Sequence, residues 1–157
     1  MYLIYKQIVL KGENMSNTND NFSVAAVRHF VDGELLQNQN RFNNAMCHYA
    51  FAAECAMKAM YEQVCANKGR KLGHELAQEW SKIEQYYFTL RILDAKAGTL
   101  FSKMSLPDKV FERHPERRYE KDIHYEEEDV EEARLFTGQL IHKIVSDALD
   151  GSIEVKE

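Results

Sequence analysis

Few residues in this chain interrupt regular structure. Among 157 residues there are only 7 glycines and 2 prolines, and runs of β-branched residues are short. Glycine and proline are the residues that most disfavour the interior of a helix. Their scarcity predicts an all-α protein, an antiparallel up-and-down bundle of four to five helices.

Cysteine is also scarce. Cys47, Cys55 and Cys65 are odd in number and form no CxxC pair. A disulfide framework and a structural zinc site are therefore not expected, and the reducing cytoplasm is the natural compartment. His29, His48 and His142 have no neighbour at metal-ligand spacing, so no metal and no cofactor is predicted, and these histidines are interpreted as packed or surface residues.

Long apolar runs are missing as well. Lys6 interrupts the apolar N-terminal stretch, and no small-residue cleavage site follows, so neither a signal peptide nor a transmembrane span is predicted. Lys11–Glu13 can be encoded as a bacterial ribosome-binding site just upstream of Met15, so the sequence leaves Met1 and Met15 as alternative translation starts. We expect an irregular segment at 1–20, one helical domain at 21–151 and a short tail at 152–157. The net charge of −5 argues against a protein that coats nucleic acid, although a local basic site stays compatible with it.

Apolar periodicity places the helices. The first should begin after Asn21 and end near residues 37–41, burying Val24, Val27, Phe30 and Val31. The second, from about Arg41 to Ala66, repeats apolar residues at steps of three and four: Ala45, Tyr49, Ala52, Ala53, Ala56, Met57, Met60 and Val64. A third should begin near Leu72 or His74 and a fourth should run through 90–104, followed by a loop at 105–125. The last helix should begin in the acidic run at 126–129, end before Gly151, and bury Val130, Ala133, Leu140, Ile141, Ile144 and Ala148.

Two local features carry polar chemistry on these helices. Glu54 and Lys58 are one helical turn apart and can pair, although they lie beside the alanine stripe. We interpret them as a salt bridge at the boundary of the core. His74 follows a basic stretch at the expected start of a helix, where capping or packing is the simpler role.

The segment ERHPERRYEKDIHYEEED at 112–129 gathers three arginines and two histidines before a run of acids. Arg118 and His124 would point about 120° apart on one continuous helix, but a loop can fold them together. A histidine can move a proton to or from a ribose hydroxyl, while an arginine holds the adjacent phosphate. Together they could cleave RNA without a metal. The alternative is a solvated loop that ends where a helix begins.

Three segments in order resemble the HEPN family (higher eukaryotes and prokaryotes nucleotide-binding), over about 22–149. RFNNAMCHYAFAAECAMKAMYEQ resembles the family's second helix, with its A-x-E-x-x-x-K-A pattern at Ala52 to Ala59. KLGHELAQEW resembles its Gly-His-acid-Leu segment. RRYEKDIHY occupies the position of its arginine–histidine motif.

The resemblance implies a helical bundle, a homodimer and, in catalytic members, a metal-independent endoribonuclease. Arg118 is separated from His124 by five intervening residues, which fits the motif, and Arg117, separated from His124 by six, also fits. Arg113 and Arg117 would bind phosphate or RNA. Glu54, Lys58 and Tyr125 would support the site, with Glu54 orienting the arginine or histidine. Such proteins serve as toxins or phage-defence effectors, and some pair with a nucleotidyltransferase antitoxin.

The motif also departs from the catalytic pattern. Catalytic members often have Asn or Asp after the arginine, whereas Tyr119 follows Arg118, and an Arg-Tyr pair is typical of non-catalytic members. In toxins paired with a nucleotidyltransferase a tyrosine stands two positions after the histidine, whereas Tyr125 follows His124 directly. A nucleotide-binding or regulatory module and an interaction or scaffold protein are the alternatives to a nuclease.

Overall fold

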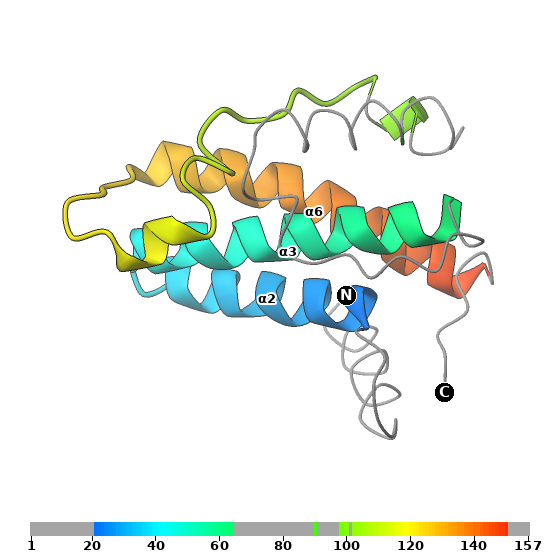
Figure 1. Cartoon of the computed structure of the whole chain (residues 1–157), viewed down its shortest axis with the longest axis horizontal. Coiled ribbons are helices and arrows are strands. Elements are labelled where there is room, and N and C mark those ends of the chain that lie inside the picture. The colour runs from blue at the N-terminus through cyan, green and yellow to red at the C-terminus, as the bar shows by residue number, and fades with distance from the viewer. Residues whose placement is uncertain (1–20, 65–89, 91–97, 101, 151–157) are drawn as a thin grey trace.

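The computed structural model describes residues 21–64, 90, 98–100 and 102–150 (Figure 1). The expected N-terminal segment with Met15, the predicted third helix with His74, most of the fourth helix and the tail lie outside the described residues. Within the described part every regular element is helical and no strand occurs, which confirms the all-α prediction there.

The first described helix, α2, spans Phe22–Gln37. It begins as predicted, because the Asn21 side chain caps it by accepting a hydrogen bond from the Val24 N–H at 3.0 Å. The predicted buried stripe is confirmed at Val27 and Phe30 and is wrong at Val24 and Val31. The observed stripe consists of Ala26, Val27, Phe30 and Gly33, whereas Val24 and Val31 are only half-buried.

Helix α3 spans Phe42–Val64 and lies at the centre of the molecule. The predicted stripe is confirmed, because all of its members whose side chains are described are fully buried: Ala45, Tyr49, Ala52, Ala53, Ala56, Met57 and Met60. Ala50 and Ala59 are buried too. The middle of α3 therefore has almost no polar face, which is the pattern of a helix covered on several sides.

Helix α6 spans Glu127–Leu149. Glu126 and Asp129 form a capping box at its N-terminus, and the acids of the first turn suit the positive end of the helix dipole. Of the predicted face, Val130, Ala133, Leu140, Ile141 and Ile144 are buried, and Ala148 is half-buried.

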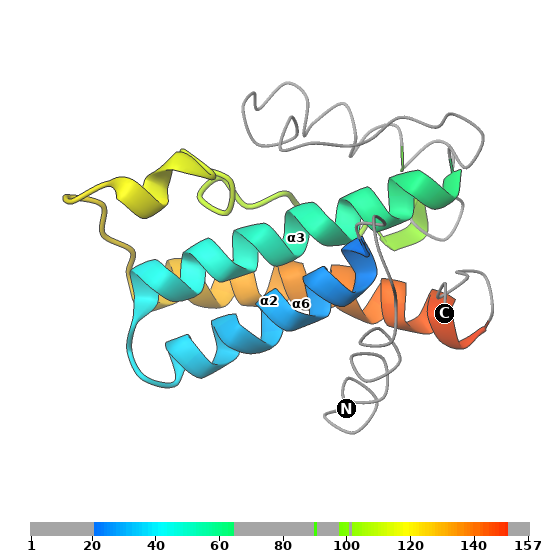
Figure 2. The ribbon, with the colours of Figure 1, turned by 60° about the horizontal axis from the view of Figure 1, so that its bottom comes forward.

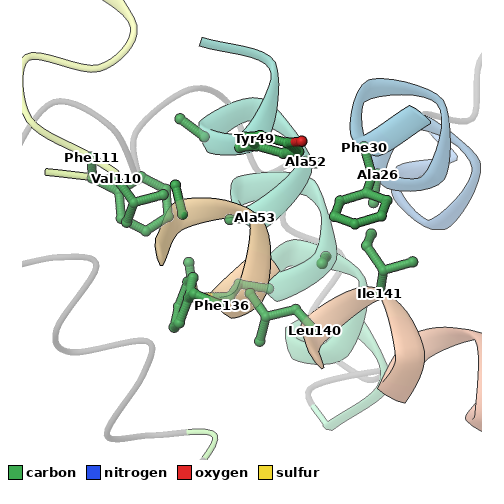
Figure 3. Close-up of a cluster of buried hydrophobic side chains, with 14 of the residues drawn as sticks. Ala26, Phe30, Tyr49, Ala52, Ala53, Val110, Phe111, Phe136, Leu140 and Ile141 are labelled. Carbon is green, nitrogen blue, oxygen red and sulfur yellow. The ribbon is translucent and has the colours of Figure 1, made fainter. Parts of the chain in front are cut away.

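The three helices pack side by side around one core (Figures 1 and 2). α2 runs opposite to α3, and α6 runs in the same direction as α3. Figure 3 shows the core between them, with Phe30 from α2, Tyr49 from α3 and Leu140 from α6 converging. α2 approaches α3 closely at Gly33, where an added Cβ would lie 2.7 Å from Cε1 of Tyr49.

The predicted loop at 105–125 is confirmed, with one short helical turn in it, but residues 102–104, predicted as the end of the fourth helix, are not helical. That turn, η2, is a 3₁₀-helix at Glu116–Tyr119, and it lies along the outer side of α3 (Figure 2). Val110 and Phe111 of the loop are buried against the core (Figure 3). The loop is therefore part of the packed structure.

Candidate functional site

A buried polar cluster joins α3 to the loop. Glu54 and Lys58, both from α3, pair at 2.5 Å between Oε1 and Nζ, and His114 from the loop brings Nε2 to 2.9 Å from Oε2 of Glu54. The three residues are 1 %, 3 % and 1 % exposed. The predicted Glu54–Lys58 pair thus exists, but it lies inside the protein and not at the boundary of the core.

The charges in this cluster follow from its geometry. Burial alone would raise the pKa of Glu54, but the hydrogen bond from His114 and the nearby Lys58 ammonium outweigh it and lower the pKa to about 2. Burial lowers the pKa of His114, more strongly than the Glu54 carboxylate raises it. We conclude that His114 is neutral near pH 7 and donates its Nε2–H to Glu54. Its Nδ1 has no hydrogen-bond partner within the described part of the chain, which also disfavours a second proton there.

The buried side chain of Arg117 holds the loop together through hydrogen bonds. Its guanidinium is 1 % exposed and donates to the carbonyl oxygens of Lys109, at 3.0 Å, and Val110, and to the Tyr125 hydroxyl at 3.0 Å. Tyr125 is held in turn, since its N–H donates to Oδ1 of Asn43 on α3 at 3.1 Å. In this geometry Arg117 and Tyr125 hold the loop in place, and the predicted contact of Arg117 with phosphate is not available while Arg117 lies buried in this way.

Arg118, the next residue, points outward. It is exposed, and its guanidinium lies over the rings of Phe51, at 5.7 Å, and Tyr119, at 4.7 Å. Among the residues that the structure describes, no carboxylate forms an ion pair with Arg118. Its cationic group is therefore supported by aromatic faces and stays accessible to an anionic ligand.

His124 and Arg113 also lie on the surface. The His124 side chain is 74 % exposed, with Nε2 at 3.3 Å from Oε1 of Glu126, which is equally open to solvent. Arg113 forms an exposed ion pair with Glu120 at 2.5 Å. In the structure Arg117 thus contacts Tyr125, and Glu54 contacts Lys58. Arg118 and His124 are both exposed on the same loop, but Arg118 lies over Phe51 and Tyr119, whereas His124 lies beside Glu126.

Sequence reasoning missed two residues of this region. His114 lies 60 positions from Glu54, so no local pattern could pair them. Phe51 contacts the rings of His29 and His114, with centroids at 5.4 and 4.6 Å, as well as Arg118. The sequence does contain one indication of the contact with His114. Glu54 and Lys58 are the only charged residues in the alanine-rich stretch at 50–60, which predicts that partners for them come from elsewhere in the fold.

Comparison of the chain with protein-family models, curated proteins and solved structures finds no match. The described residues define a helical bundle with a docked polar loop. None of the helices in that part of the chain has both the length and the hydropathy needed to cross a bilayer.

Proposed function

We propose that the chain is a HEPN-like, metal-independent endoribonuclease that acts as a homodimer in the cytoplasm. Its complete fold would be an antiparallel bundle of four to five helices. Arg118 would bind the scissile phosphate, and His124 would act as general base and acid. The observation that carries the proposal is the contrast between the two arginines. Arg117 is buried and hydrogen-bonded to the protein, whereas Arg118 is exposed, lies on aromatic rings and is separated by five residues from an exposed histidine.

The reaction needs only these groups. His124 would take the proton of a ribose 2′-hydroxyl, whose oxygen attacks the adjacent phosphorus. The bond from phosphorus to the 5′-oxygen breaks, the leaving oxygen receives a proton, and a 2′,3′-cyclic phosphate results. The Arg118 guanidinium would offset the negative charge that develops on the phosphoryl oxygens.

The surroundings of Arg118 suit single-stranded RNA. The Tyr119 side chain is 76 % exposed, which is unusual for a large aromatic residue, and an open ring can stack on a base. Arg113 lies exposed in the same loop, and an RNA phosphate would have to replace Glu120 in its ion pair before Arg113 could bind the RNA backbone. Resemblance to the family supports the dimer, in which two such loops would face one cleft, and a role as a toxin or phage-defence effector with an antitoxin partner.

A nucleotide-binding module without catalysis is the second candidate. It is favoured by the contact of His124 Nε2 with the Glu126 carboxylate and by Tyr119 directly after Arg118. In this case Arg118 and Tyr119 would hold the phosphate and base of a nucleotide, and His124 would not take part in chemistry.

The test is cleavage of single-stranded RNA by the purified full chain in the presence of EDTA. We expect cyclic phosphate ends, loss of cleavage in His124→Ala, and a larger fall in kcat than in RNA affinity for Arg118→Ala, because that contact strengthens in the transition state. His142→Ala, which removes an exposed histidine from α6, is the matched control and should cleave normally.

The alternatives give different patterns. RNA or nucleotide binding that is lost in Arg118→Ala, with no cleavage by the wild type, would favour the binding module. Cleavage that survives in His124→Ala would refute the assigned base. Light scattering that detects only monomers at micromolar concentration would contradict the paired site.

A further inference from the structure

The helices α2 and α3 bring together a second group of polar side chains that the proposed ribonuclease does not use. His29 and Asp32 lie one turn apart on α2, and His48 lies on α3. Each offers one ligand atom, and these atoms all lie within 4.8 Å of one another. The sequence alone predicted no metal ligands here, because the two histidines are 19 positions apart and only the packing of the helices joins them.

We propose that His29, Asp32 and His48 form a binding site for one divalent transition-metal ion of the zinc class, with water as the remaining ligand. Two imidazoles and one carboxylate are a donor set that suits zinc with an open position. The site goes beyond the proposed function, since Arg118 and His124 carry out their step without it.

The separation of the two histidines supports a metal more than a hydrogen bond. Their Nδ1 atoms are 3.4 Å apart, which is long for a hydrogen bond between ring nitrogens. Two nitrogens bound tetrahedrally to zinc at about 2.0–2.1 Å are about 3.3–3.4 Å apart, because that is the edge of the tetrahedron. The imidazole pair therefore already has the spacing that zinc requires.

Asp32 needs a small adjustment. Its Oδ2 lies 3.8 Å from His48 Nδ1, and its side chain is 45 % exposed, so a rotation of the carboxylate can complete the set without disturbing the core. His48 is 32 % exposed, which leaves room for a water ligand and a path for the ion. The site is therefore open, unlike a closed structural zinc site.

The packing that builds the site is specific. Gly33, which follows Asp32 on α2, allows the α2 backbone to lie against the ring of Tyr49, and Tyr49 follows His48 on α3. The His29 ring contacts the rings of His48 and Phe51, with centroid distances of 5.4 Å to each. An ion bound here would join α2 to α3, so binding should stabilise the folded protein.

The experiment uses the full chain, stripped of metal with EDTA and then freed of the chelator. Titration with Zn²⁺ by calorimetry should show one equivalent bound at micromolar or lower Kd, and Co²⁺ should give the visible absorption bands of a tetrahedral site. Saturating Zn²⁺ should raise the Tm by a few degrees. His29→Ala and His48→Ala should each weaken binding at least about a hundredfold, and Asp32→Asn at least about tenfold.

His142→Ala is the matched control and should bind like the wild type. Asp32→Asn, at a half-exposed position, should keep the circular-dichroism spectrum and so separates loss of the ion from loss of the fold. The proposal is overturned if the wild type binds no equivalent at tens of micromolar Zn²⁺, or if His142→Ala weakens binding as much as His29→Ala does. RNA cleavage in EDTA tests the other proposal separately, because neither result depends on the other.

Discussion

Replacing Glu54 by glutamine tests whether the buried cluster is held by charge. The substitution keeps the size and shape of the side chain but removes the negative charge that faces Lys58 at 2.5 Å. The Lys58 ammonium, 3 % exposed, would then face an amide oxygen. Removing one partner of a buried ion pair typically destabilises a protein by about 3–5 kcal/mol. The total free energy of unfolding of a domain of this size is about 5–15 kcal/mol, so Glu54→Gln should lose a large share of the protein's stability.

Urea unfolding at pH 7, followed by circular dichroism, measures this loss. Glu132→Gln is the matched control, since Glu132 is an exposed glutamate of α6, and it should change the free energy of unfolding by no more than about 0.5 kcal/mol. A loss below about 1 kcal/mol in Glu54→Gln would refute the reasoning, because it would mean that the carboxylate does not neutralise a buried cation.

A double variant separates the charge from the packing. Glu54→Leu leaves Lys58 without its counter-charge, and Lys58→Met leaves Glu54 with His114 as a weaker partner. Both changes together remove the ion pair and leave apolar side chains of similar volume, but they also leave the buried His114 Nε2–H without its acceptor. Glu54→Leu leaves His114 unpaired in the same way and leaves the buried Lys58 ammonium unpaired in addition, so the double variant should be more stable than Glu54→Leu. If the loss in free energy of unfolding in the double variant equals the sum of the losses in the two single variants, the pairing of Glu54 with Lys58 would be contradicted.

Acidification should destabilise the fold in two stages. His114 has a lowered folded pKa, so the unfolded chain binds a proton first and stability falls as the pH drops below 6.5. For Glu54 the loss of stability runs from pH 4.5 towards about 2 and amounts to roughly 3 kcal/mol. Urea midpoints measured against pH check both: a flat profile between pH 6.5 and 4.5 would contradict the assignment for His114, and a flat profile below pH 4.5 would contradict that for Glu54. Gly33→Ala should destabilise by about 1–3 kcal/mol, because the new Cβ would meet the buried Tyr49 ring at 2.7 Å and overpacking exceeds the gain in helix propensity. Gly138→Ala is its control in the same unfolding assay: its Cβ would meet its nearest neighbour at an ordinary 3.4 Å, so it should be neutral or stabilising by up to about 1 kcal/mol, and equal effects of the two substitutions would show that the close approach at Gly33 is not limiting.

Local patterns predicted those parts of the fold that depend on local physics. Asn21 could be recognised as the start of α2, because a capping side chain acts within three residues. The alanine stripe of α3 and the acidic start of α6 were predictable for the same reason, since periodicity and dipole interactions repeat every turn. The buried stripe of α2 was predicted correctly at Val27 and Phe30, but Ala26 and Gly33 are buried in place of Val24 and Val31, because α2 is apolar on several faces and the positions of α3 and α6 select among them.

The candidate site depends on contacts that the sequence does not encode locally. Glu54 contacts His114, which is 60 positions away in the sequence, and His29 on α2 contacts His48 on α3. The sequence predicted that Glu54 and Lys58 pair, but it assigned them to the boundary of the core, because the loop that covers them has no periodic pattern. The burial of a loop can be derived only from what it docks against.

The two neighbouring arginines require different evidence before either is called catalytic. Arg117 donates to two loop carbonyls and to the Tyr125 hydroxyl, so Arg117→Ala would leave buried acceptors without a donor and disturb the loop that carries Arg118. A loss of RNA cleavage in Arg117→Ala would therefore not favour the six-residue spacing to His124, because misplacement of Arg118 gives the same result. Arg118 is exposed, and its removal leaves no buried group unpaired. Only loss of activity at unchanged stability assigns a chemical role, and among the two arginines Arg118 is the one whose environment permits that outcome.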